Sequence, residues 1–155
     1  MKATVHTTGI EQTIRKLDGL KKSMRSRIVR RAVNAGATII LQSSRSLIRR
    51  RSGFSAKALG RKGRTKKDEY LVKIGARSSY ETVVDGRKHQ PFHVLHLIEK
   101  GTQPHEITTR RGATYIHPGS KPYPFLQPSL DGNRGQVNTA MSKKIMEGIM
   151  QEASK

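Results

Sequence analysis

The stretch 23-SMRSRIVRRAVNAGATIILQSSRSLI-48 does most to determine the fold of this chain. Its apolar residues recur at steps of three and four, with further apolar neighbours beside them: Met24, Ile28, Ala32, Ala35 and Ile39, then Val29, Val33 and Ile40. This period predicts one long helix from Ser23, a suitable N-cap residue, to about Ile48. The apolar face is broad, so we expect it to be buried against the rest of the chain.

The opposite face of this predicted helix is a polar stripe without a carboxylate. It consists of Arg27, Arg31, Asn34, Thr38, Gln42, Arg45 and Arg49. Charged runs of this kind are often only a solvated helix face. The alternative is a helix that lies along phosphates or an acidic partner, because the arginine guanidinium binds phosphate and carboxylate equally well. Both interpretations stay open at this point.

A strongly basic segment follows, 49-RRRSGFSAKALGRKGRTKK-67, with nine basic residues and no acidic one. Its glycines, Gly53, Gly60 and Gly63, lead us to expect a mobile arm over residues 49–68 that becomes ordered on contact. The other possibility is a permanently disordered, solubilising loop. For contact with DNA or an acidic partner we select these residues: Arg27, Arg31, Arg45, Arg49, Arg50, Arg51, Arg61, Lys62, Arg64, Lys66 and Lys67.

The composition points to the same partners. The 155 residues include 31 Lys and Arg against 11 Asp and Glu, which gives a formal charge of +20. Residues 1–68 hold 19 of the basic and 3 of the acidic side chains, so the first half carries most of the charge. Such a chain needs a polyanionic partner to offset its self-repulsion. Aromatic residues make up 5%, which disfavours single-strand binding by base stacking.

Length and cysteine content narrow the fold further. A chain of this length forms one domain, and the absence of cysteine excludes disulfides and thiolate zinc sites. The longest apolar stretch is too short to span a membrane, and the N-terminus lacks a signal-peptide core. We therefore expect a single soluble domain over residues 1–155, made in the cytoplasm.

The remaining elements follow from periodicity, turn residues and proline. We expect strands at Lys2–His6, Tyr70–Ile74 and Tyr80–Val84, a hairpin of His105–Thr109 with Gly112–Ile116, and helices at Gly9–Leu20, Phe92–Lys100 and Ser129–Ala153. Residues 117–128 are a proline-rich connector. The fold class is α+β, with long N-terminal helices and a C-terminal helix packed on a small, mostly antiparallel sheet, and with a flexible basic arm.

Catalytic motifs are missing from the sequence. There is no P-loop, GxGxxG, GxSxG or HExxH, and the carboxylates are few and isolated. His89, His93, His96 and Glu99 could share one helix face, but Pro91 interrupts that helix and the apolar neighbours indicate packing. We expect no enzyme activity, no catalytic residue, no cofactor and no metal site.

The segment 96-HLIEKGTQPHEITTRRGATYIHPGSKPYPFLQPSLD-131 carries the most specific pattern. It resembles the neck or tail-completion (tail-component) family of long-tailed bacteriophages, to which phage lambda's minor tail protein Z is related. The matching residues are Glu99, Gly101, Thr102, His105, His117, Pro118, Gly119, Pro124, Phe125, Leu126, Pro128, Leu130 and Asp131. Ser129 stands where alanine is usual, and the family's proline after the long helix is replaced within Leu47–Gly53.

The resemblance implies a structural virion protein that joins the DNA-filled head to the tail as a ring around the DNA channel. It implies a homo-oligomeric ring, expected to be a hexamer, between head-closure and tail-terminator rings, with genomic double-stranded DNA inside. The location would be the virion neck or upper tail, and the host cytoplasm during assembly. Its structural or interface motif comprises Glu99, Gly101, Thr102, His117, Pro118, Gly119, Pro124, Phe125, Leu126 and Pro128. We expect Phe125, framed by prolines, to serve as a core anchor.

Two other functions compete with this one. A free, basic protein that binds double-stranded nucleic acid would explain the charge but not the proline-framed motif. A small basic ribonuclease toxin would need His105, Arg110, Arg111 and Tyr115 to gather on one sheet face. Salt-dependent binding by the monomer would favour the first alternative, and growth arrest on expression would favour the second.

Overall fold

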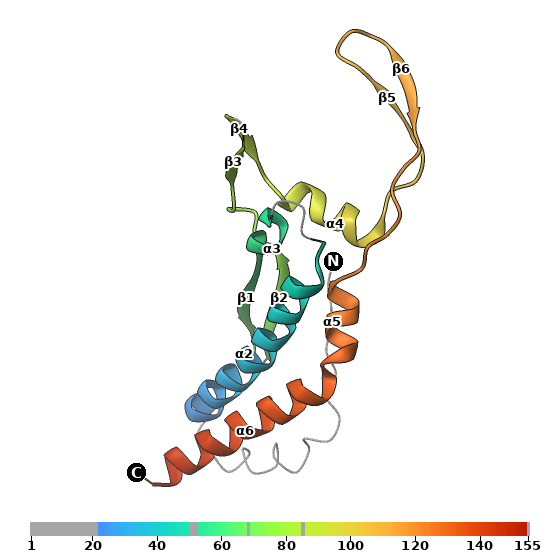
Figure 1. Cartoon of the computed structure of the whole chain (residues 1–155). Helices are drawn as coiled ribbons and strands as arrows, with labels where there is room; N and C mark the ends of the chain where they lie inside the picture. The colour runs from blue at the N-terminus through green and yellow to red at the C-terminus, as the bar shows by residue number, and fades with distance from the viewer. Residues whose placement is uncertain (1–21, 50–52, 68, 85, 155) are drawn as a thin grey trace.

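The computed structural model of the protein describes residues 22–49, 53–67, 69–84 and 86–154. Their elements, in order, are α2 (Lys22–Leu47), α3 (Phe54–Ala58), β1 (Leu59–Lys66), β2 (Glu69–Ala76), β3 (Thr82–Val84), β4 (Arg87–His89), α4 (Phe92–Lys100), β5 (His105–Thr108), β6 (Thr114–His117), α5 (Leu126–Gly132) and α6 (Arg134–Ala153) (Figure 1). The predicted α+β class is confirmed. The predicted strand Lys2–His6 and helix Gly9–Leu20 lie outside the described residues.

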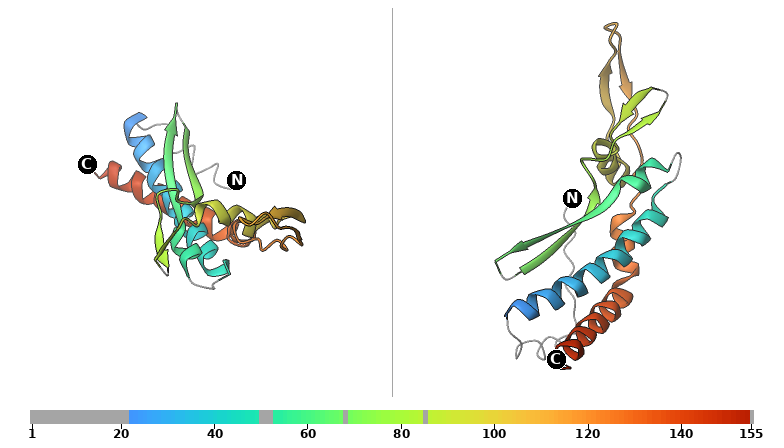
Figure 2. Two further views of the ribbon diagram at one scale, coloured as in Figure 1. Left: turned by 90° about the horizontal axis from the view of Figure 1, so that it is seen from above. Right: turned by 90° about the vertical axis from the view of Figure 1, so that its left-hand side faces the viewer.

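The long helix α2 lies beside the C-terminal helix α6, and the two run in opposite directions (Figures 1 and 2). Buried Ile28, Ala32 and Ile145 form one apolar cluster between them. A glycine on each helix permits the close approach. A Cβ at Gly36 would lie 2.9 Å from Val137 Cγ1, and one at Gly148 would lie 2.8 Å from Ile28 Cγ1.

The basic segment after α2 differs from the predicted mobile arm. Its described part forms α3 and the whole of β1, which pairs with β2 in one antiparallel register from Leu59 opposite Ala76 to Lys66 opposite Glu69. Burial of Ala58 and Leu59 in the main core anchors the strand. Gly63 belongs to this packing, because a Cβ there would collide with the Tyr70 side chain. The glycine that suggested disorder is thus a site of close contact.

The main core lies where the upper end of α2 meets α3, β1, α4 and α5. It consists of Leu41, Ile48, Ala58, Leu59, Leu95 and Phe125. Phe125 is among the largest fully buried side chains. Its predicted role as a core anchor is confirmed.

The strands of the described residues form three separate two-stranded hairpins and not one small sheet. Each is antiparallel, and only β1–β2 lies along α2. The β3–β4 and β5–β6 hairpins project from the helical body, the latter farthest (Figure 1). Short strands with few apolar residues cannot cover a common core, which explains their separation. The β5–β6 hairpin lies close to the predicted strands His105–Thr109 and Gly112–Ile116, whereas β1 and its turn belong to the segment predicted to be a mobile arm.

The predicted single helix from Ser129 to Ala153 is two helices, α5 and α6, that meet at Asn133. The Asn133 side-chain amide donates to Ser43 Oγ at 2.9 Å and to the Ser129 carbonyl at 2.8 Å, which holds the bend against α2. Pro128 lies in the first turn of α5, where a missing N–H costs little. Among the described helices, none is both long enough and apolar enough to cross a membrane.

Candidate functional site

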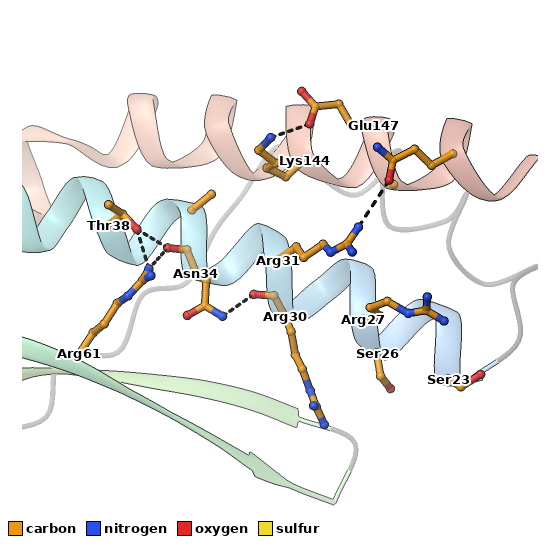
Figure 3. A pocket seen from close by; sticks show the side chains of 13 residues that line it. Ser23, Ser26, Arg27, Arg30, Arg31, Asn34, Thr38, Arg61, Lys144 and Glu147 are labelled. Carbon is orange, nitrogen blue, oxygen red and sulfur yellow. Dashed lines mark hydrogen bonds and ion pairs between the residues drawn. The ribbon is translucent and has the colours of Figure 1, made fainter. Parts of the chain in front are cut away.

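A groove of about 1090 Å³ runs between α2, the β1–β2 hairpin and α6 (Figure 3). Most of its lining comes from one face of α2, at Ser23, Ser26, Arg27, Arg30, Arg31, Asn34, Ala35 and Thr38. Strand β1 contributes Arg61, and α6 contributes Lys144, Glu147, Gly148 and Gln151. Part of the predicted polar stripe therefore lines a concave surface between three elements.

The groove is strongly basic. Its lining holds five cationic side chains and one carboxylate, that of Glu147. Lys144 Nζ donates to Glu147 Oε2 at 2.6 Å, and this bond lowers the pKa of Glu147 against the opposing effect of desolvation. The negative charge of Glu147 is therefore offset by the positive charge of Lys144. The four arginines of the lining then determine the electrostatic potential of the groove.

Hydrogen bonds inside the groove fix several side chains. Arg61 Nη1 donates to Thr38 Oγ1 at 2.5 Å and to the Asn34 carbonyl, so β1 is tied to α2. The Asn34 amide donates to Tyr70 Oη at 3.0 Å. Arg61 therefore has a structural role in the chain, in addition to its charge.

Two arginines of the groove, Arg27 and Arg31, contact the end of α6. Arg27 lies 3.8 Å from Glu152 Oε1, and Arg31 Nη1 donates to Gln151 Oε1 at 3.4 Å. Both contacts are long and at the surface, so each contributes little to stability. The guanidinium groups can exchange them for a stronger anion. The arrangement suits binding of phosphate or carboxylate groups, and it contains no pair of free carboxylates for acid–base chemistry.

The structure brings together only some of the predicted contact residues. Arg27, Arg31 and Arg61 line the groove. Arg45 is half-buried, and its Nη2 donates to the Leu59 carbonyl at 2.7 Å, which supports the main core. Arg49 lies over the Tyr123 ring at 5.6 Å from the centroid.

The remaining contact residues lie elsewhere. Lys62, Arg64, Lys66 and Lys67 are exposed on β1 and its turn, away from the groove. Arg50 and Arg51 lie outside the described residues. The residues selected from the sequence omit Arg30 and Lys144, which also line the groove. Arg30 follows Arg27 by three residues, so the helical period could have revealed it, whereas Lys144 lies on α6 and no local pattern connects it to α2.

The motif behind the family resemblance forms a structural joint. Glu99, at the end of α4, is buried, and its carboxylate accepts hydrogen bonds from the backbone N–H groups of Phe125 at 2.9 Å and Leu126 at 3.2 Å. A longer contact of 3.4 Å reaches the N–H of Gln127. These are the donors that a helix leaves unpaired at its N-terminus, so Glu99 caps α5 from a distant part of the chain.

A second part of the joint closes the base of the β5–β6 hairpin. The backbones of Thr102 and Ser120 exchange two hydrogen bonds of 3.0 Å each. Gly101 has a positive φ of 70°, and a Cβ there would lie 2.5 Å from the Ser120 carbonyl oxygen. Gly119 has a φ of 80°, and its N–H donates to His117 Nδ1 at 3.0 Å. Pairing this tight leaves no room for a side chain at either glycine.

Other members of the motif are exposed or partly exposed. Pro118 and Pro124 lie at the surface of the connector, and Pro128 lies at the surface of α5. Leu126 is partly buried against the main core. The motif thus has a buried half, formed around Glu99 and Phe125, and an accessible half at the prolines.

The structure does not bring together the side chains of two sites considered from the sequence, a metal site and a ribonuclease site. His93 and His96 are exposed on α4, while Glu99 is buried and occupied by α5. In the described part of the chain, no three His, Asp or Glu side chains are placed to hold a metal ion. On the β5–β6 hairpin, His105 begins β5 and Arg110 and Arg111 lie at the far turn, so the residues considered for a ribonuclease do not converge.

Comparison with known proteins assigns this chain to no family. A scan of protein-family models, a search of curated proteins and a search of solved structures each gave no match to this chain.

Proposed function

We propose that this chain is a structural virion protein of a bacteriophage neck, which joins the DNA-filled head to the tail as a ring around the DNA channel. The observation that carries the proposal is the β5–β6 hairpin, which projects far from the helical body (Figure 1). It carries exposed apolar side chains, and hydrogen bonds close its base. Such a projection has no role in the monomer's own core. It suits a protein whose partners complete it.

The surface of the hairpin supports an assembly role. Ile116 is 76% exposed and Tyr115 is 51% exposed. Both strands pack mainly against each other, in a register that pairs His105 with His117 and Thr108 with Thr114. Because consecutive residues of a strand point to opposite faces, each face of the hairpin exposes one of these apolar side chains. A neighbouring copy or an adjoining ring would bury them.

The joint at the base of the hairpin also favours an architectural function. The residues of the family motif are engaged in capping α5 and in closing the hairpin, through Glu99, Gly101 and Gly119. These contacts fix the direction of the hairpin relative to α4 and α5. A fixed hairpin direction is what a ring needs, because each copy must meet the next at the same angle.

The proposed partners are further copies of the chain, with six expected, the head-closure and tail-terminator rings, and the genomic DNA in the channel. The proposed location is the neck or upper tail of the virion, and the host cytoplasm during assembly. The basic groove would face DNA or acidic surfaces of the adjoining rings. Heterologous contacts that repeat around an axis would close the ring.

A second candidate is a free protein that binds double-stranded nucleic acid. The charge of +20 and the basic groove favour it. It leaves the exposed apolar residues of the β5–β6 hairpin unexplained, so we rank it second.

Immunogold electron microscopy tests the first candidate. Antibodies against the chain are applied to purified particles of the phage that encodes it and to thin sections of infected host cells. We expect gold at the head–tail junction of each particle. Label spread over host nucleoid, with none on the particles, would favour the free nucleic-acid-binding protein.

A further inference from the structure

The β1–β2 hairpin has two faces of different character. Residues directly opposite each other in an antiparallel pair share one face, and the faces alternate along each strand. Arg61, Thr65, Tyr70, Val72 and Ile74 share the face toward α2, where Arg61 and Tyr70 hydrogen-bond to it. The alternate residues form the outward face, which consists of Lys62, Arg64 and Lys66 on β1 with Glu69, Leu71 and Lys73 on β2.

The outward face holds four cations and one carboxylate, that of Glu69. Lys62 lies directly opposite Lys73, and like charges in this position destabilise a hairpin. All four basic residues of the face are exposed. Among the described residues, none of the four forms an ion pair, including Lys66, whose cross-strand neighbour is Glu69. An external anion would relieve this repulsion.

The spacing and composition of the face favour a nucleic acid over an acidic protein. Successive side chains on one face of a strand are about 6.8 Å apart, so β1 presents an evenly spaced row of cations. Protein interfaces are depleted of lysine at their centres and rely on apolar anchors, and Leu71 is the only large apolar side chain on this face. Interfaces with DNA are polar and strongly positive.

We infer that the outward face of the β1–β2 hairpin binds the phosphate backbone of duplex nucleic acid through Lys62, Arg64, Lys66 and Lys73. A two-stranded ribbon has the dimensions to lie in or along the major groove. The face carries no aromatic ring and no amide side chain to read a base edge, so the contact is independent of sequence. The inference goes beyond the proposed neck function and does not depend on it, because it concerns the surface of the single chain.

The face is distinct from the groove in Figure 3, from which all four residues are excluded. Arg61 shows the difference, since it lies between the chain neighbours Gly60 and Lys62 but turns inward to Thr38. Lys73 was not selected from the sequence as a contact residue. Its position opposite Lys62 depends on the register, which the structure supplies.

The test is a titration of a labelled 30-base-pair duplex of random sequence with the full chain at several salt concentrations. The variant combines Lys62→Gln, Arg64→Gln and Lys73→Gln. The matched control combines Arg87→Gln, Lys100→Gln and Lys121→Gln, which removes the same number and kind of exposed charges from β4, α4 and the connector. Circular dichroism checks that both are folded.

Each phosphate contact contributes about 0.9 to the slope of log K against log salt. We therefore expect the slope of the variant to be shallower than that of the wild type by about 2.7, and that of the control by less than about 1. Equal slopes for variant and control would overturn the inference, as would a wild type that does not bind the duplex. If polyglutamate binding were lost in the variant while duplex binding persisted, the face would belong to an acidic protein.

Discussion

The carboxylate of Glu99 accepts a hydrogen bond of 2.9 Å from the backbone N–H of Phe125, and both residues are buried, at 4% and 1% exposure. Glu99 lies in the last turn of α4 and Phe125 immediately precedes α5, so this contact joins the two ends of the segment that carries the β5–β6 hairpin. The core and the projecting hairpin therefore share one joint. Changes at the joint should affect both.

The first prediction concerns this carboxylate. Glu99→Gln replaces one acceptor oxygen with a donor that faces backbone N–H groups, and it removes a charge at the start of α5. Hydrogen bonds to charged groups contribute about 1.5–3 kcal/mol each, so we expect the free energy of unfolding to fall by about 2 kcal/mol. Urea denaturation measures it. The control, Glu106→Gln on exposed β5, should stay within about 0.5 kcal/mol of the wild type. Equal effects would show that the cap is unimportant.

The second prediction separates backbone strain from lack of space at the base of the hairpin. Gly112 and Gly119 both have positive φ, of 83° and 80°. A Cβ at Gly112 would meet nothing within 4 Å, whereas one at Gly119 would collide with the Thr102 carbonyl. We expect Gly112→Ala to cost about 1 kcal/mol and Gly119→Ala to cost about 1–3 kcal/mol more. Thermal unfolding compares them, and a similar cost for both would mean that the base can open without penalty.

The third prediction concerns the contact between α2 and α6. In a helix, replacing glycine by alanine can raise the free energy of unfolding by up to about 1 kcal/mol. Gly135, in the first turn of α6, has open space for the added methyl group. A methyl group at Gly36 would instead lie 2.9 Å from Val137 Cγ1, so the same change there forces the helices apart. We expect Gly36→Ala to be about 1–3 kcal/mol less stable than Gly135→Ala in urea. Equal stability would indicate that the two helices have freedom to shift.

The fourth prediction concerns assembly. Ile116→Thr keeps a β-branched residue on exposed β6, so the free energy of unfolding should change by less than about 0.5 kcal/mol. If a partner buries Ile116, the purified variant should restore at least about tenfold fewer infectious particles when added to a lysate that lacks the chain, since about 1.4 kcal/mol is one factor of ten.

The matched variant for assembly is Val83→Thr, which alters an exposed apolar residue of the other projecting hairpin. We expect it to restore particles as the wild type does. Full restoration by Ile116→Thr would remove the β5–β6 hairpin from the proposed interface. If neither variant restores particles, the result would not distinguish the β5–β6 hairpin from the β3–β4 hairpin, which would contradict a specific role of the former in assembly.

The sequence predicted those elements whose signal is local. The period of α2 follows from its own apolar residues, and the helix Phe92–Lys100 follows from its own. The pairing of β1 is different. Nothing within the basic segment shows that Leu59 is buried or that Gly63 faces Tyr70, because both facts depend on β2 and the main core. The segment therefore resembled a mobile arm.

The same distinction applies to the candidate site. The stripe of Arg27, Arg31, Asn34 and Thr38 could be read from the helical period, and it does line the groove. The opposite wall, with Lys144 and Gln151, comes from a helix more than a hundred positions later in the chain, so only the tertiary structure reveals it. Glu99 was selected because of the family pattern. Its action as a cap for α5 could not be derived from spacing, since the two partners are 26 residues apart.

The most direct test of the neck proposal is electron microscopy of a lysate in which the gene for this chain alone carries a stop codon. The proposal predicts separate DNA-filled heads and finished tails, which join into infectious particles when the purified protein is added. Intact infectious particles formed without the chain would contradict it.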